Sequence, residues 1–299
     1  MFAFIEAPSQ GWTSPRVLAA LLAGVAASLA FVTVERRVQM PMLPLALLRS
    51  ADFGGANLLT LLLYAALGGG LYFFPLNLIQ VQGYSATAAG AALLPFILIL
   101  FALSRWTGQL ADRVGARLPL VVGPAVAAAG FALFAVPGTA ASYWTGFFPA
   151  VVVLGLGMAI TIAPLTTTVM NAVGTDSAGV ASGVNNAVSR VAAVLAIAVF
   201  GLLMAWAFDA RLDAGLREMS APPEVVDFLA GQRARLAEAA LPPGMEGAAA
   251  DALREQIRAA YVSGFRWIML ASAGLALLSS LAAWLLIGKA DVGRERRAS

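Results

Sequence analysis

Seven apolar stretches, each long enough to cross a lipid bilayer, constrain this sequence more than any other feature. A transmembrane helix needs about 20 apolar residues, because the hydrocarbon core of a bilayer is about 30 Å thick. The stretches lie near residues 16–34, 55–79, 87–106, 118–137, 145–170, 179–208 and 263–288. Neither the alternation of a β-strand nor the period of a soluble amphipathic helix fits them. The sequence therefore predicts an all-α polytopic membrane protein with seven transmembrane helices.

The composition agrees with a chain that is solvated largely by lipid. Only 12% of the 299 residues are charged and 60% are hydrophobic, whereas about a quarter of the residues of a typical soluble domain are charged. The 19 basic residues slightly outnumber the 16 acidic ones and are scattered among the loops that flank the apolar stretches. We interpret them as determinants of membrane topology. We expect membrane lipid as a partner and no nucleic acid.

Basic residues also predict the orientation of the chain. They gather after the first stretch, between the third and the fourth, and after the last, whereas the loops near 80–86 and 138–144 have none. Cytoplasmic loops carry an excess of Lys and Arg, so the basic loops are predicted to be cytoplasmic. The amino terminus and the polar segment 209–262 are then outside. The basic residues concerned are Arg36, Arg37, Arg49, Arg105, Arg113, Arg117, Lys289, Arg294, Arg296 and Arg297.

Tryptophan gives an independent indication of where the spans end, because its amphipathic ring prefers the membrane–water interface. All six tryptophans fall at or near a proposed span end: Trp12, Trp106, Trp144, Trp206, Trp267 and Trp284. We therefore expect a multi-pass protein of the plasma membrane, which is the inner membrane in a Gram-negative cell.

The residue types that are missing exclude most enzymatic functions. The sequence has no cysteine and no histidine, so disulfides, thiol chemistry, histidine acid–base catalysis and His/Cys metal sites are excluded. Its only lysine, Lys289, lies beyond the last apolar stretch, so no lysine within a span is available for a Schiff base. We expect no enzymatic activity, no metal and no cofactor.

Three of the stretches carry polar residues at helical spacing on one face, and such faces point into the bundle or into a watery cavity. The candidates for a substrate path are Asn57, Tyr64, Tyr72, Thr161, Thr168, Asn186 and Arg190. The alternative is helix packing, because small and polar residues let helices approach and hydrogen-bond. Arg190 has a further interpretation. The sixth stretch is about 45 Å long at 1.5 Å per residue, which leaves Arg190 near the inner interface, where it snorkels.

The sequence GQLADRVGAR at residues 108–117 resembles the cytoplasmic loop signature of the major facilitator superfamily. Residues 57–69, 82–96, 155–170 and 178–192 are similar to one branch of it, the fourteen-helix drug/proton antiporters of the EmrB/QacA type. The resemblance implies export of small amphipathic compounds against protons by alternating access. It also implies that residues 1–50 contain the end of a preceding helix, a linker helix and a cytoplasmic connection, and that residues 51–299 form the carboxy-terminal six-helix half.

The departures from this family are as informative as the match. The features that the family carries in its amino-terminal half, including an acidic residue linked to proton coupling, have no counterpart here, and no Asp or Glu lies deep in any stretch. We therefore expect a missing amino-terminal half or a second chain as partner. The alternative is a non-transporting fragment or membrane scaffold. Each half of this superfamily is described as two inverted three-helix repeats, so spans two to four should mirror spans five to seven.

The motif residues Gly108, Asp112, Arg113, Gly115 and Arg117 are predicted to form a conformational gate, which we call the gate loop. Glycines permit tight turns of positive φ. Asp112 is expected to lie against the start of a neighbouring helix near Gly179, where the helix dipole favours an anion. Arg113 and Arg117 are expected to pair with acids. The alternative, a purely topological role, explains the arginines but neither Asp112 nor the glycines.

The polar segment 209–262 is predicted to form two helices, 224–241 and 246–261, each preceded by a proline pair. A solvated helical hairpin on the outer surface is one interpretation. A docking platform for a periplasmic adaptor protein is the other.

Overall fold

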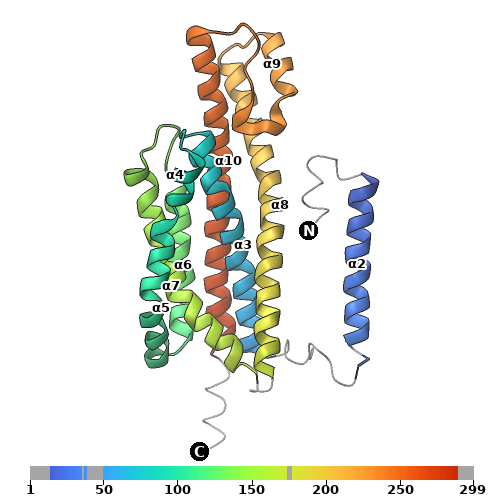
Figure 1. Ribbon diagram of the computed structural model, residues 1–299, viewed down its shortest axis with the longest axis vertical. Helices are drawn as coiled ribbons and strands as arrows, with labels where there is room; N and C mark the ends of the chain where they lie inside the picture. Colours follow the sequence, from blue (N-terminus) through green and yellow to red (C-terminus); the bar gives the residue numbers. More distant parts are fainter. Residues whose placement is uncertain (1–13, 36, 39–49, 174–176, 289–299) are drawn as a thin grey trace, which may run out of the picture.

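The structure is a computed structural model that describes residues 14–35, 37–38, 50–173 and 177–288, except for the side chains of residues 28, 31, 32 and 110–112. These parts of the chain are helical and contain no strand. Figure 1 shows a bundle of long helices with a smaller helical region above it and one helix, α2, standing apart. The all-α polytopic fold is therefore confirmed.

Six helices of the described residues are long and apolar enough to span a membrane, and they match the last six predicted spans. The first predicted span is helix α2, whose apolar stretch Pro15–Ala27 is shorter. Trp12 and the basic residues at 36, 49 and 289–297 lie outside the described residues. The elements are α2 (Pro15–Glu35), α3 (Ala51–Gln80), α4 (Ala86–Ala91), α5 (Leu94–Val114), α6 (Arg117–Phe134), a π-helix η2 (Tyr143–Phe147), α7 (Phe148–Asn171), α8 (Ala178–Glu218), α9 (Pro223–Ala230), a 3-10 helix η4 (Arg233–Glu238) and α10 (Gly247–Leu286).

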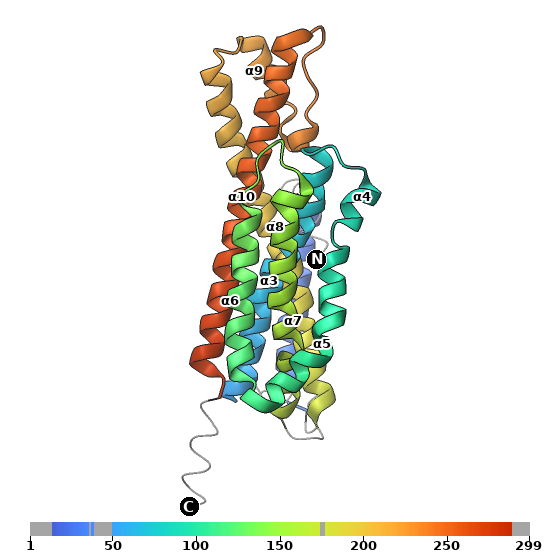
Figure 2. The ribbon, with the colours of Figure 1, turned by 90° about the vertical axis from the view of Figure 1, so that its left-hand side faces the viewer.

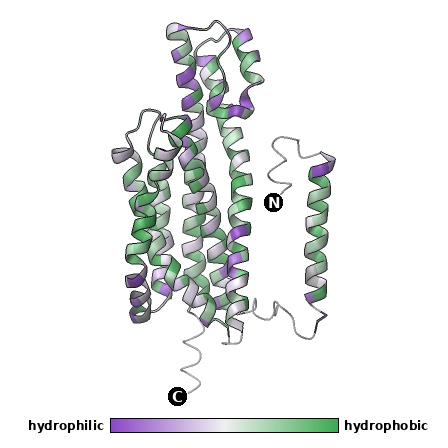
Figure 3. Ribbon diagram, viewed as in Figure 1, coloured by the Kyte–Doolittle hydropathy of each residue, from purple (hydrophilic) through white to green (hydrophobic). Residues whose placement is uncertain are grey.

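Two helices run far beyond their predicted spans and build the region above the bundle. Helix α8 has 41 residues and α10 has 40, and both continue into segment 209–262, which we call the cap. The predicted helix 224–241 is wrong in length, because α9 ends at Ala230 and only the short η4 follows. The predicted helix 246–261 begins close to its expected start but is continuous with the last span. The cap is the hydrophilic end of the long helices in Figure 3.

Tryptophans locate the membrane on the long helices. Trp267 and Trp284 are both about half exposed on α10. Their positions are 17 residues apart, which corresponds to about 26 Å of helix, close to the thickness of the hydrocarbon core. The rings of Trp206 on α8 and Trp267 lie 6.2 Å apart, so one boundary crosses both helices at this level. The opposite boundary then crosses α8 at about residue 189, which agrees with the expectation that Arg190 lies near an interface.

The packing of the six spans follows the symmetry expected of two inverted repeats. Helix α3 packs on α8 and α10, α7 packs on α5 and α6, and α6 packs on α10. Exchanging α3 with α7, α5 with α8 and α6 with α10 turns the contacts of α3 into those of α7 and leaves the α6–α10 contact unchanged. The α8–α10 contact breaks this symmetry, because α5 and α6 pack on each other far less. Helices α8 and α10 also continue together into the cap, whereas α5 and α6 end at their spans.

Glycines and serines hold the central seams together. A Cβ on Gly130 of α6 would lie 2.6 Å from the backbone nitrogen of Leu154 on α7, so only glycine permits this approach. On α10, the hydroxyls of Ser272 and Ser279 donate to the carbonyls of Ala66 and Leu59 on α3, at 3.3 and 3.1 Å. The hydroxyl of Ser280 donates to the carbonyl of Val121 on α6 at 2.7 Å. Small residues and interhelical hydrogen bonds of this kind drive helix association in lipid.

Candidate functional site

The gate loop is shorter than predicted, because most of its residues are helical. Helix α5 continues through Gly108 and Asp112 to Val114, so the expected glycine turn is wrong for Gly108. It is correct for Gly115, which has a φ of 80° and separates α5 from α6. The joint between the two helices is therefore only two residues long. The side chain of Asp112 lies outside the described part, so its expected contact near Gly179 stays a prediction.

The two arginines of the gate loop do not form ion pairs among the described residues. Arg113 is exposed in the last turn of α5, where a cation is favourable to the helix dipole. Arg117 donates from Nη2 to the carbonyl of Trp284 at 2.6 Å. The expectation that Arg117 pairs with an acid is thus replaced by a hydrogen bond to one of the free carbonyls at the end of α10.

A second contact fixes the same end of α10. The backbone N–H of Gly288 donates to Oδ1 of Asp52, in the first turn of α3, at 2.9 Å. Gly288 has a φ of 78° and also lies against the side chain of Arg117. The ends of α3, α6 and α10 are therefore tied together on the side of the gate loop, and the joint between α5 and α6 adjoins this tie.

Of the candidates for a substrate path, Asn57 belongs to a buried polar cluster between α3 and α8. Its side-chain N–H donates to the carbonyl of Phe53 at 2.9 Å. Asn185 of α8 donates to Oδ1 of Asn57 at 3.3 Å and to Oγ1 of Thr60 at 2.7 Å. Asn57 is therefore a packing residue. Asn185 was missed in favour of its neighbour Asn186, and its only signal in the sequence is its polarity within a span.

Thr161 and Thr168 of α7 are also buried inside the bundle. Each hydroxyl donates to a backbone carbonyl one turn earlier in the same helix, Gly157 and Pro164 respectively, at 2.8 Å. Thr161 in addition fills the space left by Gly123 of α6. For these two residues the packing alternative describes what the structure shows.

The remaining candidates lie on the surface of the bundle. Tyr72, Asn186 and Arg190 are exposed and Tyr64 is half buried. The structure does not gather the seven candidates around one cavity of this chain. These seven residues therefore do not define a substrate path among the described residues.

Two helices, α5 and α8, have faces that no other described helix covers. Helix α5 packs extensively only on α7 and lies along one edge of the bundle in Figure 2. Its apolar side chains are bare, and Phe101 is 83% exposed. Helix α8 exposes Asn186, Arg190 and Val191. These two helices occupy equivalent positions in the two repeats, so the open surfaces are related by the same symmetry as the packing.

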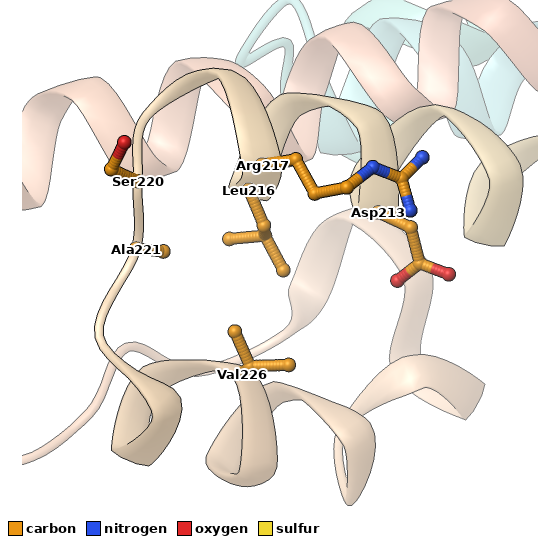
Figure 4. A pocket seen from close by; sticks show the side chains of 6 residues that line it. All are labelled: Asp213, Leu216, Arg217, Ser220, Ala221 and Val226. Carbon is orange, nitrogen blue, oxygen red and sulfur yellow. The ribbon is translucent and has the colours of Figure 1, made fainter.

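The cap has a charged core and a small pocket. Arg233 of η4 donates to Asp213 of α8 at 2.6 Å and approaches Asp209 at 3.4 Å. The hydrogen bond to Asp213 raises the pKa of Arg233, against the opposing effect of burial, and attraction to the two carboxylates adds to it. Figure 4 shows the pocket, of about 190 Å³, between the end of α8 and α9. It lies beyond Trp206 and thus outside the membrane. Its lining residues are Asp213, Leu216, Arg217, Ser220, Ala221 and Val226.

Comparison with known proteins places these features in context. Residues 4–197 match the Major Facilitator Superfamily. A multidrug resistance protein, Stp, of Mycobacterium tuberculosis is 30% identical over 75% of this chain and 41% of its own length. A tetracenomycin C resistance and export protein of Streptomyces glaucescens is 29% identical over 95% of this chain and 53% of its own. A puromycin resistance protein of Streptomyces alboniger is 34% identical over 71% of this chain and 42% of its own. The chain thus spans about half the length of these relatives.

Proposed function

The chain belongs to the major facilitator superfamily, and from this premise we propose that it is one six-helix half of a drug-exporting transporter of the fourteen-helix EmrB/QacA branch. The residues before Ala51 contribute a linker helix, and residues 51–299 form the half itself. The proposed activity is efflux of small amphipathic compounds in exchange for protons. Relatives named for antibiotic resistance and export support this substrate class.

The observation that carries the proposal is the pairing of a complete inverted repeat with two uncovered helices. Within the bundle, α3, α6, α7 and α10 each pack on at least two other spans. The apolar face of α5 and the exposed polar residues of α8 find no partner among the described residues. A second six-helix bundle opposite these faces would enclose Tyr72, Asn186 and Arg190 between two halves. Alternating access then arises when the two bundles rock about the enclosed site.

The gate loop is proposed to couple this motion to the interior of the half. Because the joint at Gly115 is short, a tilt of α5 is transmitted to α6 and, through the Arg117–Trp284 hydrogen bond, to α10. In this proposal Asp112 holds one arrangement by a contact with the start of α8. Protons would be carried by the second half, since no acidic residue lies deep in the described spans.

The proposal is tested by dye efflux from bacteria that lack their own exporters. The chain alone, shown by immunoblot to be in the membrane, is expected to give no efflux above empty vector. Co-expression with the part of the Streptomyces glaucescens relative that this chain does not cover is expected to restore efflux that stops when the proton gradient is dissipated. Efflux by the chain alone, or none from the assembled pair, contradicts the proposal.

The gate is tested in the assembled pair with two matched substitutions. Asp112→Asn removes the charge of the gate loop and is expected to lower efflux severalfold at unchanged membrane level. Asp52→Asn is the control, because its amide oxygen still accepts the hydrogen bond from Gly288. Equal efflux from the two variants would show that Asp112 is only a topological residue.

A further inference from the structure

An apolar groove crosses the surface of the bundle at mid-membrane. It has a volume of about 210 Å³ and lies between α3 and α8, with one residue of α10 at its base. On α8 it extends from Ala192 to Phe200, and the midpoint between the two membrane boundaries on this helix falls at about residue 197. The groove is therefore at the centre of the bilayer. Its lining residues are Leu61, Ala65, Ala192, Leu195, Ala196, Val199, Phe200 and Leu275.

Helix α2 is the one apolar helix of the described chain that does not pack on the bundle (Figure 1). Leu22, Val25 and Leu29 are 70%, 58% and 63% exposed and recur at intervals of three and four residues. This spacing places them in one stripe along the helix. Val25 is the central residue of α2, whose bounds are Pro15 and Glu35. The stripe is therefore also at the centre of the bilayer.

We propose that α2 docks into this groove, with Leu22, Val25 and Leu29 inserted between α3 and α8. The small side chains Ala65, Ala192 and Ala196 leave the space that the larger side chains of α2 would fill. Close approach over small residues is the usual basis of helix packing in membranes.

The register of the two helices supports this pairing. Helix α2 runs towards the gate-loop end of the bundle and α8 runs away from it, so they are antiparallel (Figure 1). With both centres at the bilayer midplane, Val25 lies at the level of residue 197, next to Ala196 of the groove. Leu22 then lies at the level of Phe200 and Leu29 at the level of residue 193, next to Ala192, so each member of the stripe lies within one residue of the groove.

The connection between α2 and the bundle makes this occupant more favourable than a separate chain. Fifteen residues join Glu35 to Ala51, and such a linker reaches at most about 50 Å when extended. Groove and stripe are thus held in the same membrane at short range, which raises their effective concentration above that of a second copy with no tether.

Disulfide cross-linking tests the docking directly, because the chain has no native cysteine. The variant with Val25→Cys and Leu195→Cys carries one thiol in the stripe and one in the groove. The control combines Val25→Cys with Leu277→Cys, which is exposed near the middle of α10 on another face. A protease site placed within residues 36–50 lets α2 separate from the bundle unless a disulfide holds it.

After oxidation in membranes and proteolysis, we expect α2 to stay with the bundle on a non-reducing gel in the first variant and to be released in the control. Filling the groove from an exposed lining position with Val199→Trp should abolish the cross-link while the protein keeps its size-exclusion profile. Equal retention in both variants, release in both, or a band of two linked chains would overturn the proposal. The readout needs no transport, so its failure is distinct from failure of the proposed function.

Discussion

Helices α5 and α6 are joined by two residues and cross the same membrane, yet they differ in almost every contact. Helix α6 packs on α7 and α10, and half of the residues in its span are buried. Helix α5 packs extensively only on α7, and among its described side chains only that of Thr107 is buried. Because both helices are apolar, hydropathy does not explain the difference. Helix α6 lies in the interior of the bundle, whereas α5 presents a bare apolar face, which in the proposed function a second half covers.

The same substitution on α5 and on α6 tests whether the two helices differ in their contribution to stability. Phe131 of α6 is 1% exposed and packs against Gly70 of α3, so Phe131→Ala should lower the free energy of unfolding by about 3 kcal/mol through the cavity that it leaves. Phe101→Ala on α5 should change it by less than about 0.5 kcal/mol. Thermal unfolding of both variants in detergent measures the difference. Similar losses would mean that α5 is as much a core helix as α6.

The second prediction concerns the closest approach between two helices. Gly130→Ala should destabilise the chain by about 1–3 kcal/mol, because the added Cβ would lie 2.6 Å from the backbone of Leu154. Gly201→Ala on α8 is the matched control, since no atom lies within 4 Å of a Cβ at that position. The same unfolding measurement applies. A neutral Gly130→Ala would show that the α6–α7 seam is looser than described.

The smallest expected effect sharpens the comparison on α8 itself. Asn185→Ala removes the hydrogen bonds to Asn57 and Thr60, and bonds of this kind in membranes contribute about 0.6 kcal/mol on average. Asn186→Ala alters an exposed residue and should leave the stability of the isolated chain unchanged. In the assembled pair the order should reverse for efflux, because Asn186 faces the proposed second half. An efflux defect confined to Asn185→Ala would contradict this assignment.

The spans of this fold could be predicted from the sequence, because a backbone in lipid must satisfy its own hydrogen bonds and only long apolar helices do so here. The residues at which the helices end could not be predicted in this way. Asp209, Arg211 and Asp213 are polar and ended the predicted sixth span, yet α8 continues through them to Glu218. In this extension Leu212 and Leu216 are buried within the cap, and Arg233 pairs with Asp209 and Asp213.

The sequence predicted which residue types belong to the candidate site, but not the direction in which each side chain points. Asn185 and Asn186 are adjacent in the sequence, but about 100° separates their side chains around a helix. One therefore bonds to α3 and the other faces outward. Which of them is buried depends on the rotation of α8 against α3, which is set by contacts such as Gly68 against Ala193. No local pattern encodes that rotation.

A photo-cross-linking amino acid placed at Phe101, in the middle of the bare face of α5, tests directly whether a second half covers this face. The chain is co-expressed with the part of the Streptomyces glaucescens relative that it does not cover, and cross-linked products are identified by mass. The same probe at Leu277 on α10 is the control. We expect a strong cross-link to the second half from position 101 and little from position 277. No cross-link from position 101, or equal yields from both positions, would contradict it.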